Sequence, residues 1–278
     1  MLKALKDPAK TDSYRAIAGS SLILKLLDNV IILIWGDKLG SDSLQFGFKE
    51  NVSTTQCSWR VSEVAAHYVR SGKPVIATLL DCSKAFDKCE FVQLFRKLLK
   101  KGLPTVVVRM LIFIYREQVA WVRWGSEKSA TFRISNGTRQ GSVLSPTLFA
   151  VYIDDLLLDL RKLGLGCHMG GMWMGAVGFA DDILLLAPSR NAMVKMLEIC
   201  EDFATRNHLQ FSTDPNPVKA KSKCIFMTGP RLRNQNKPVP LQLYGVDLPW
   251  VEKASHLGHE LHQDCNMDYD CNCKRGRF

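Results

Sequence analysis

The spacing of apolar residues along the chain predicts six helices. Apolar positions that recur every three or four residues are typical of a helix with one face buried. The first stretch, Ser21 to about Ile34, is interrupted by Lys25 and Asp28 and is too short to cross a bilayer, so we expect a buried helix. The other helices are predicted at Trp59–Val69, Glu90–Lys101, Thr105–Arg116, from Pro146 onward, and around Met193–Phe203.

Short, continuous apolar runs predict buried strands between these helices. The run Val75–Leu80 ends on Asp81, and two further runs flank Asp181-Asp182 in the pattern of strand, tight turn and strand. Strands that arrive separately, with helices between them, favour an α+β fold with one antiparallel sheet packed on helices. The remaining strands are predicted as a hairpin over Val119–Ile134, followed by a turn at Asn136-Gly137, and as a strand over Cys224–Met227.

Composition adds a basic charge to this picture. The chain has 278 residues, 46% of them hydrophobic, and its 37 Lys and Arg exceed its 27 Asp and Glu to give a net charge of +10. This is enough apolar material for one large domain, and the charge fits a partner with a phosphate backbone. A basic surface that is merely solvated has the same composition, so charge alone leaves both interpretations open.

The nine cysteines predict reduced, buried thiols rather than a disulfide framework, because their number is odd and none form a C-x-x-C pair. Cys265, Cys271 and Cys273 lie near His259 and His262, but their spacing matches no common zinc site. The N-terminal residues lack the pattern of a secretion signal, so we expect a protein that is not secreted.

Three carboxylates occupy the ends of predicted strands. Asp81 closes one strand, and Asp181 and Asp182 lie in the turn of the apolar hairpin, so their side chains can converge. Carboxylates held close together repel one another, and divalent cations with oxygen ligands relieve that repulsion. Two such ions about 4 Å apart can support an in-line phosphoryl displacement. The alternative is structural, with Asp-Asp as a favourable turn dipeptide and Asp81 as a helix N-cap.

The residues around these carboxylates resemble the motifs of reverse transcriptases. Leu79–Asp87 resembles the first catalytic motif, Phe179–Asp182 resembles the hairpin motif, and Asn136–Pro146 resembles the loop that faces template and nucleotide. The Ser-Lys-Ala-Phe-Asp form of the first motif and the Phe-Ala-Asp-Asp form of the second are similar to non-LTR, LINE-type retroelements. Group II intron and telomerase polymerases share the chemistry but fit these forms less well.

The resemblance covers roughly residues 12 to 260. Tyr14–Ala18 and Gln45–Lys49 resemble fingers motifs, Lys221–Lys223 resembles a motif that carries a lysine near the triphosphate, and His256–Gly258 resembles the primer grip. Val143 departs from the usual proline.

The resemblance implies the fingers and palm of a right-hand polymerase, over residues 1–262. The fingers would comprise about 1–74 with part of 90–135, and the palm about 75–89 and 136–262, with an antiparallel palm sheet packed on helices. Residues 263–278 would be a basic C-terminal tail at the start of a missing thumb or connection, so the thumb is expected to be largely absent. The endonuclease of a parent element is also expected to be missing.

By resemblance, Asp81 and Asp181 ligate two Mg²⁺ ions, with Mn²⁺ as an alternative metal, and Asp182 supports the site or joins the ligands. The carbonyl of Cys82 would be a further ligand. Phe86 corresponds to a bulky position that excludes a ribose 2′-hydroxyl, although it is equally suited to be an ordinary core aromatic.

Four further residues are expected to contact the nucleotide. Gln140 and Gly141 belong to the loop that faces it, since glycine permits close backbone approach and an amide can hydrogen-bond sugar or base. Arg15 and Lys221 would neutralise triphosphate charge. Lys219 and Lys223 compete with Lys221 for this role.

A second acidic pair, Asp154-Asp155, superficially resembles the retroviral hairpin motif. It falls in the helix predicted from Pro146, where adjacent side chains point about 100° apart and do not converge on one metal pair. We therefore assign the site to Asp181-Asp182.

The resemblance implies an RNA-directed DNA polymerase that takes an RNA template, a DNA primer and dNTPs, without a membrane, in the nucleus or cytoplasm. Two alternatives stay open. One is an inactive fragment or relic of a retroelement with its fold retained. The other is a basic nucleic-acid-binding protein without catalysis, which has no need of three carboxylates in a basic groove.

Overall fold

The computed structural model describes residues 19–139, 141–229 and 235–265. The described residues up to Gly40 form one compact unit with Phe86–Tyr152, and Ser41–Ala85 forms a second with the described residues from Ile153 onward. Residues 41–74 therefore belong to the same unit as the predicted palm strands. The division into fingers and palm by function stays a prediction.

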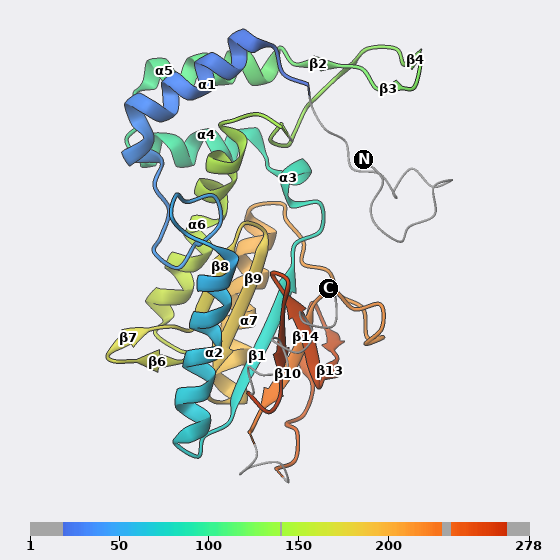
Figure 1. Ribbon diagram of the computed structural model, residues 1–278. Helices are drawn as coiled ribbons and strands as arrows, with labels where there is room; N and C mark the ends of the chain where they lie inside the picture. The colour runs from blue at the N-terminus through green and yellow to red at the C-terminus, as the bar shows by residue number, and fades with distance from the viewer. Residues whose placement is uncertain (1–18, 140, 230–234, 266–278) are drawn as a thin grey trace, which may run out of the picture. The chain divides into compact units, whose positions relative to one another are not determined.

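A five-stranded sheet organises the second unit, in the order β13-β10-β1-β9-β8 (Figure 1). Its neighbouring strands are antiparallel except for β10 and β13. The central strand β1 is buried along its apolar length, as its continuous apolar run predicts, and the strand, turn and strand around Asp181-Asp182 are also confirmed. The strands are β1 Val75–Asp81, β8 Ala176–Phe179, β9 Asp182–Ala187, β10 Lys223–Met227 and β13 Trp250–Val251.

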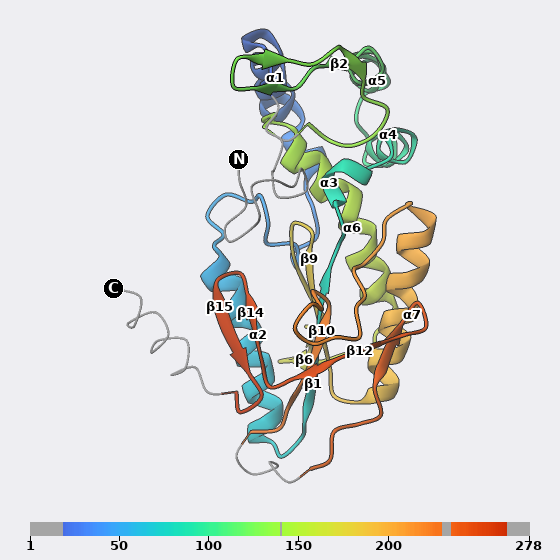
Figure 2. The same ribbon diagram turned by 90° about the vertical axis from the view of Figure 1, so that its right-hand side faces the viewer.

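Helices cover both faces of this sheet. Figures 1 and 2 show α2 (Thr54–Arg70) on one face and α7 (Arg190–Arg206) on the other. A capping box at Ser53 and Gln56 starts α2 by satisfying backbone N–H groups that have no partner inside the helix. On the α7 side, an ion pair of 3.2 Å joins Arg206 to Asp159 of α6 (Ser145–Leu163), the helix predicted from Pro146.

Three short hairpins complete the second unit. They pair β6 with β7, β11 with β12, and β14 with β15. The last hairpin contains His256, which the sequence places in the primer-grip resemblance. Their bounds are β6 His168–Met169, β7 Met172–Trp173, β11 Leu241–Leu243, β12 Val246–Leu248, β14 Lys253–His256 and β15 His259–His262.

The first unit is mainly helical, and its elements agree with the predicted helices and hairpin. β2 pairs with β5 and β3 with β4 inside the predicted Val119–Ile134 hairpin. The elements are α1 Leu22–Trp35, η2 Gly36–Leu39, α3 Ala85–Lys88, α4 Phe91–Lys100, α5 Thr105–Arg116, β2 Val119–Ala120, β3 Arg123–Trp124, β4 Glu127–Lys128 and β5 Phe132–Arg133.

The prediction that the first helix is buried was wrong for most of its length. In α1 only Asp28 and Ile31 are buried, while Leu22 and Leu33 are 83% and 85% exposed. The apolar residues extend around more of the helix than the single face that packs against its unit, so the apolar pattern overstates burial. Within the described part of the chain, every helix is too short or too polar to traverse a bilayer.

The thiols agree with the prediction from cysteine spacing. None of the described cysteines is joined to another described cysteine by a disulfide, and six of them are buried. Burial raises the pKa of five of these six thiols, for example to about 12 for Cys57 and Cys224, so those five remain protonated at neutral pH. The six are Cys57, Cys82, Cys89, Cys167, Cys200 and Cys224.

Asp28 is the buried charge that ties α1 to its unit. Its carboxylate accepts a hydrogen bond of 2.5 Å from the Ser142 hydroxyl and lies 3.9 Å from the Arg139 guanidinium, which stacks 5.4 Å from the Tyr115 ring. Ser142 and Arg139 flank the predicted nucleotide-facing residues 140 and 141. The helix and the loop therefore stabilise each other.

We expect Asp28→Ala to lower the free energy of unfolding by about 3 kcal/mol, because it leaves the Arg139 cation and the Ser142 hydroxyl buried without their acceptor. The midpoint of urea denaturation measures the change. Asp37→Ala, at an exposed position of the same unit, serves as the control and should change stability by less than about 0.5 kcal/mol. Equal effects of the two substitutions would contradict the assigned role of Asp28.

Candidate active site

The pairing of β1 with β9 brings the predicted carboxylates together. Asp81, the last residue of β1, lies directly opposite Asp182, the first residue of β9. Asp181 belongs to the turn between β8 and β9, next to Ala180, whose φ of 58° lies in the left-handed region. Residues 100 positions apart in sequence thus present three carboxylates at one end of two paired strands.

Hydroxyl and ammonium groups surround Asp81. One carboxylate oxygen, Oδ2, accepts hydrogen bonds from the Ser212 hydroxyl at 2.9 Å and from the Lys221 ammonium at 3.1 Å. The Asp81 backbone N–H donates to the Ser222 hydroxyl at 3.1 Å. The Ser212 backbone N–H donates to the Asp81 carbonyl at 2.8 Å. Asp81 is therefore fixed from both its backbone and its side chain.

The electrostatics of the site favour a bound cation. The pKa of Asp182 is raised to about 6, first by the loss of solvent around its carboxylate and then by the negative charges of Asp181 and Asp81, while Lys221 lowers it in part. A divalent ion would relieve the repulsion that holds this pKa up.

The donor set fits a magnesium or manganese ion, because hard divalent cations prefer carboxylate oxygens. In the described residues, no three or more metal-ligating side chains are already gathered around one point. The Lys221 ammonium forms an ion pair with one side of the Asp81 carboxylate. Because the Lys221 side chain is largely exposed, this ion pair adds positive charge to the site but contributes little to the stability of the fold.

The chain matches a known family along most of its length. The family described as "Reverse transcriptase (RNA-dependent DNA polymerase)" matches residues 5–261. This chain belongs to the reverse transcriptase family.

Similar proteins place it among polymerases of non-LTR retroelements. A retrovirus-related Pol polyprotein from the type-1 retrotransposable element R2 of Nasonia vitripennis is 33% identical over 91% of the chain and 24% of that protein. The corresponding polyprotein of R2DM from Drosophila melanogaster is 25% identical over 74% of the chain and 19% of that protein. The probable RNA-directed DNA polymerase from transposon BS of the same fly is 26% identical over 92% of the chain and 28% of that protein.

These relatives confirm the predicted resemblance to non-LTR elements. The reverse transcriptase chain spans about a quarter of the length of the first relative and about a fifth of the second. Among solved structures, telomerase from Candida tropicalis in complex with a telomeric RNA fragment has a TM-score of 0.55 at 9% identity, covering 88% of this chain and 36% of that one. At this identity the likeness shows the fold alone, and it confirms the predicted right-hand polymerase architecture.

Three further residues predicted to contact nucleotide or metal lie among the described residues of this reverse transcriptase, Phe86 and Gly141 in the first unit and Cys82 in the second. Phe86 stacks on Phe149 with ring centroids 4.3 Å apart, so part of its ring is in aromatic packing, as the alternative of a core aromatic expects. Gly141 has a φ of 112°, which glycine adopts without strain. Cys82 is buried and bridges to Phe211. Their roles toward nucleotide or metal stay predictions, and Arg15 and Gln140 lie outside the described residues.

The loop before Gly141 is held against the residues that follow β1. The Gly137 N–H donates to the Cys89 carbonyl and the Thr138 N–H to the Phe86 carbonyl, both at 2.8 Å. Gly137 has a φ of 91°, and a Cβ there would lie 3.0 Å from the backbone of Asp87. Glycine is required at this turn for both reasons.

The rival acidic pair lies on a helix, as predicted. Asp154 and Asp155 fall within α6, and Asp154 is 2% exposed and accepts a hydrogen bond from the Asp42 backbone N–H. This bond gives Asp154 a structural role within the second unit.

The cluster of histidines and cysteines near the C-terminus lies only partly in the described region, because Cys271 and Cys273 fall outside it. Burial lowers the pKa of His256 to about 4 and raises that of the Cys265 thiol to about 12. Both groups are therefore neutral at pH 7.

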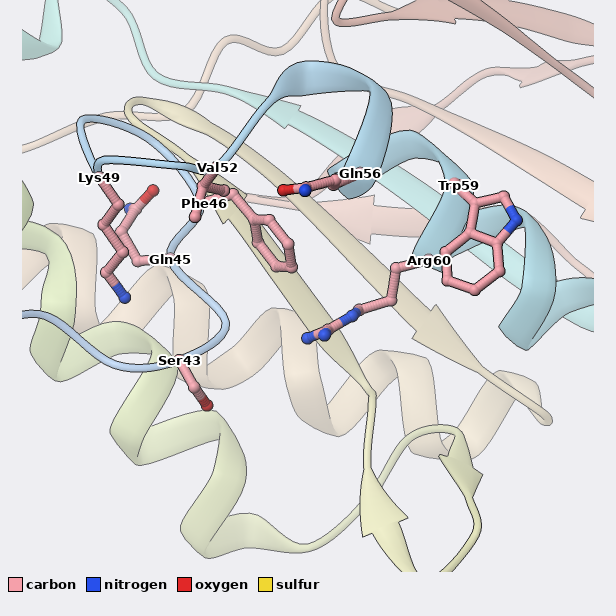
Figure 3. A pocket seen from close by; sticks show the side chains of 8 residues that line it. All are labelled: Ser43, Gln45, Phe46, Lys49, Val52, Gln56, Trp59 and Arg60. Carbon is pink, nitrogen blue, oxygen red and sulfur yellow. The ribbon is translucent and has the colours of Figure 1, made fainter.

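Sequence reasoning assigned no chemical role to Gln45 beyond its place in a fingers motif. The structure puts this residue in the wall of a hollow of about 330 Å³ (Figure 3), lined by Ser43, Gln45, Phe46, Lys49, Val52, Gln56, Trp59 and Arg60. The Arg60 guanidinium lies 4.9 Å from the centre of the Phe46 ring, which links α2 to the segment that carries Gln45. No local pattern in the sequence distinguishes Gln45 from an ordinary surface glutamine.

We expect Asp182→Asn to raise the melting temperature by about 2 °C at pH 7.5 in EDTA and to leave it unchanged near pH 3. A raised pKa means that the folded state pays for ionising Asp182, and this cost is present above about pH 6 and absent once the carboxyl is protonated in both states.

Differential scanning calorimetry at the two pH values measures this difference. Asp202→Asn, an exposed carboxylate of α7, is the matched control for the loss of one charge. A melting temperature that falls at pH 7.5 in Asp182→Asn would contradict the repulsion inferred from the pKa.

Proposed function

We propose that this chain is the catalytic core of an RNA-directed DNA polymerase of a non-LTR retroelement. Its substrates would be an RNA template, a DNA primer and dNTPs. The observation that carries the proposal is the register of β1 and β9, which sets Asp81 opposite Asp182 and beside Asp181 in a reverse transcriptase chain. A protein that only binds nucleic acid gains nothing from three carboxylates that repel its polyanionic ligand.

Asp81, Asp181 and Asp182 would hold two Mg²⁺ ions, with the Cys82 carbonyl as a further ligand and Mn²⁺ as an alternative metal. Bound there, the ions would lower the pKa of the attacking primer hydroxyl and would stabilise the leaving oxygen. The residues of the chain position this centre. Ser212 and Ser222 fix Asp81, and Lys221 reaches the same oxygen from the next segment.

Lys221 would neutralise triphosphate charge when a nucleotide is bound. In the structure its ammonium lies 3.1 Å from the Asp81 carboxylate, and this ion pair supports the proposal. Lys219 is exposed in a neighbouring turn and Lys223 belongs to β10, so among the three competing lysines the ion pair to Asp81 favours Lys221.

The other nucleotide contacts follow from the family resemblance. Phe86 would exclude ribonucleotides, Gln140 and Gly141 would contact the incoming nucleotide, and Arg15 would bind its triphosphate. The net charge of +10 supports a nucleic-acid partner. Action inside the cell, in the nucleus or cytoplasm, is part of the same proposal.

Primer extension on an RNA template with dNTPs and Mg²⁺ tests the polymerase proposal. We expect extension by the wild-type chain and a loss of at least about 1,000-fold in Asp181→Ala/Asp182→Ala, since removing the ligands removes the electrostatic stabilisation of the reaction. Asp155→Asn, in the rival pair on α6, should extend primers like the wild type.

Extension by the double variant would show that these carboxylates are not the site. If neither chain extends a primer while both bind RNA in a salt-sensitive manner, the chain is a relic or a binding protein, and the polymerase proposal fails.

We expect Lys221→Ala to raise KM for dNTPs about tenfold, which corresponds to the loss of about 1.4 kcal/mol of charge-assisted binding. Single-nucleotide incorporation at varied dNTP concentration measures the effect. Lys219→Ala removes an equal charge from the neighbouring turn and should leave KM within about twofold. An equal rise in both variants would indicate general electrostatics rather than a specific contact.

A further inference from the structure

The segment Leu44–Gly47 runs beside the strand that leads into the Asp181-Asp182 turn. The Phe46 N–H donates to the Gly178 carbonyl at 2.7 Å, and the Gly178 N–H donates to the Leu44 carbonyl at 2.8 Å. Gln45 and Gly178 form a parallel bridge. The segment thus pairs with β8 along the edge of the sheet, and this pairing brings the Gln45 side chain to the end of that strand.

The Gln45 amide satisfies both backbone groups of Ala180. Its Oε1 accepts from the Ala180 N–H at 2.9 Å, and its Nε2 donates to the Ala180 carbonyl at 3.4 Å. The same Oε1 accepts from the Gly47 N–H at 2.9 Å. Gln45 is 0% exposed, so water does not compete for these groups. A buried amide with all three contacts made holds its neighbours in one arrangement.

Ala180 needs such support because its φ of 58° is costly for a residue with a Cβ. A backbone in that conformation persists where the surrounding structure fixes it. Ala180 directly precedes Asp181, and Asp182 follows, so the conformation at Ala180 sets the direction in which both carboxylates leave the turn.

Gly47 allows the close approach that this contact needs. A Cβ at Gly47 would lie 2.4 Å from the Ala180 nitrogen, closer than atoms can pack. The backbone of Gly47 therefore lies close to the backbone of Ala180, and the Gln45 side chain adds its hydrogen bonds to Ala180. Figure 3 shows Gln45 on the loop that leads into α2.

We propose that Gln45 is a positioning residue that clamps Ala180 and so aims Asp181 and Asp182 at the cation that they share with Asp81. This inference rests on the proposed function in one respect, since it takes the three carboxylates to be the metal ligands. The alternative is that Gln45 only stabilises the edge of the sheet.

Gln45→Met tests the clamp, because methionine keeps the volume of the side chain and removes its hydrogen bonds. Leu186→Ala is the destabilising control, as it removes a buried side chain from β9 without touching the clamp. We expect amide hydrogen exchange at Ala180 to be at least about tenfold faster in Gln45→Met relative to the rest of the sheet. In Leu186→Ala the exchange rate of the Ala180 amide should change no more than the rates of other amides in the sheet.

Titration of the intact chain with Mn²⁺, followed by electron paramagnetic resonance, tests the consequence for the carboxylates. We expect the Kd for Mn²⁺ to rise about tenfold or more in Gln45→Met, as for other groups that orient metal ligands, and to stay within about twofold in Leu186→Ala. In primer extension the Mg²⁺ concentration for half-maximal rate should rise in parallel. A purely structural role lowers the active fraction and leaves both constants unchanged.

If Gln45→Met does not fold, the same substitution can be tested in a chain that also carries Ala180→Gly. Ala180→Gly removes the strain of the left-handed conformation. Gln45→Met/Ala180→Gly is then compared with Ala180→Gly alone, with the same expected rise in Kd.

The two proposals fail separately. Changed exchange and Mn²⁺ binding in a chain that never extends primers would overturn the polymerase proposal and support the clamp. Primer extension with unchanged exchange, or with unchanged metal constants, would overturn the clamp and leave the polymerase proposal standing. A wild-type chain that binds no Mn²⁺ at millimolar concentration would overturn the positioning role.

Discussion

The register between β1 and β9 is the constraint on which the candidate site depends. Antiparallel pairing sets Asp81 opposite Asp182, and a slip of one residue would turn every side chain of the strand to the other face of the sheet. The buried apolar residues on both strands oppose such a slip. The same strand register thus buries the apolar side chains and brings the carboxylates together. The free energy gained by burying the apolar side chains offsets the repulsion between the carboxylates.

Each unit uses a buried polar group to hold a segment that belongs to a predicted motif. In the first, Asp28 of α1 contacts Ser142 and Arg139 on either side of the predicted nucleotide-facing residues. In the second, Gln45 contacts Ala180 before the acidic turn. Both groups are almost fully buried, and an unsatisfied polar atom is costly away from water. That cost makes one arrangement of each loop much more stable than its alternatives.

Local sequence was sufficient for the long helices and for the strands that end at the three carboxylates, but not for the hairpins β6-β7, β11-β12 and β14-β15. The apolar run of β1 and the two runs around Asp181-Asp182 carry their own signal, and their strand ends predicted that the carboxylates converge. The burial of α1 was mispredicted because an apolar pattern shows which side chains can be buried, while the extent of the neighbouring surface decides how many are. The choice of Lys221 over Lys219 needed the path of the chain before β10. The role of Gln45 depends on a partner 135 residues away, a separation that no local pattern encodes.

The contact between Gln45 and Ala180 also bears on how copies of a retroelement lose competence. Mutations accumulate at random in a retroelement copy that is no longer under selection. Such a copy can keep all three acidic residues and so look intact when only those residues are compared. A change at Gln45 or Gly47 would leave that signature in place and still disturb the turn. In this chain Gln45 and Gly47 both retain the contact with Ala180.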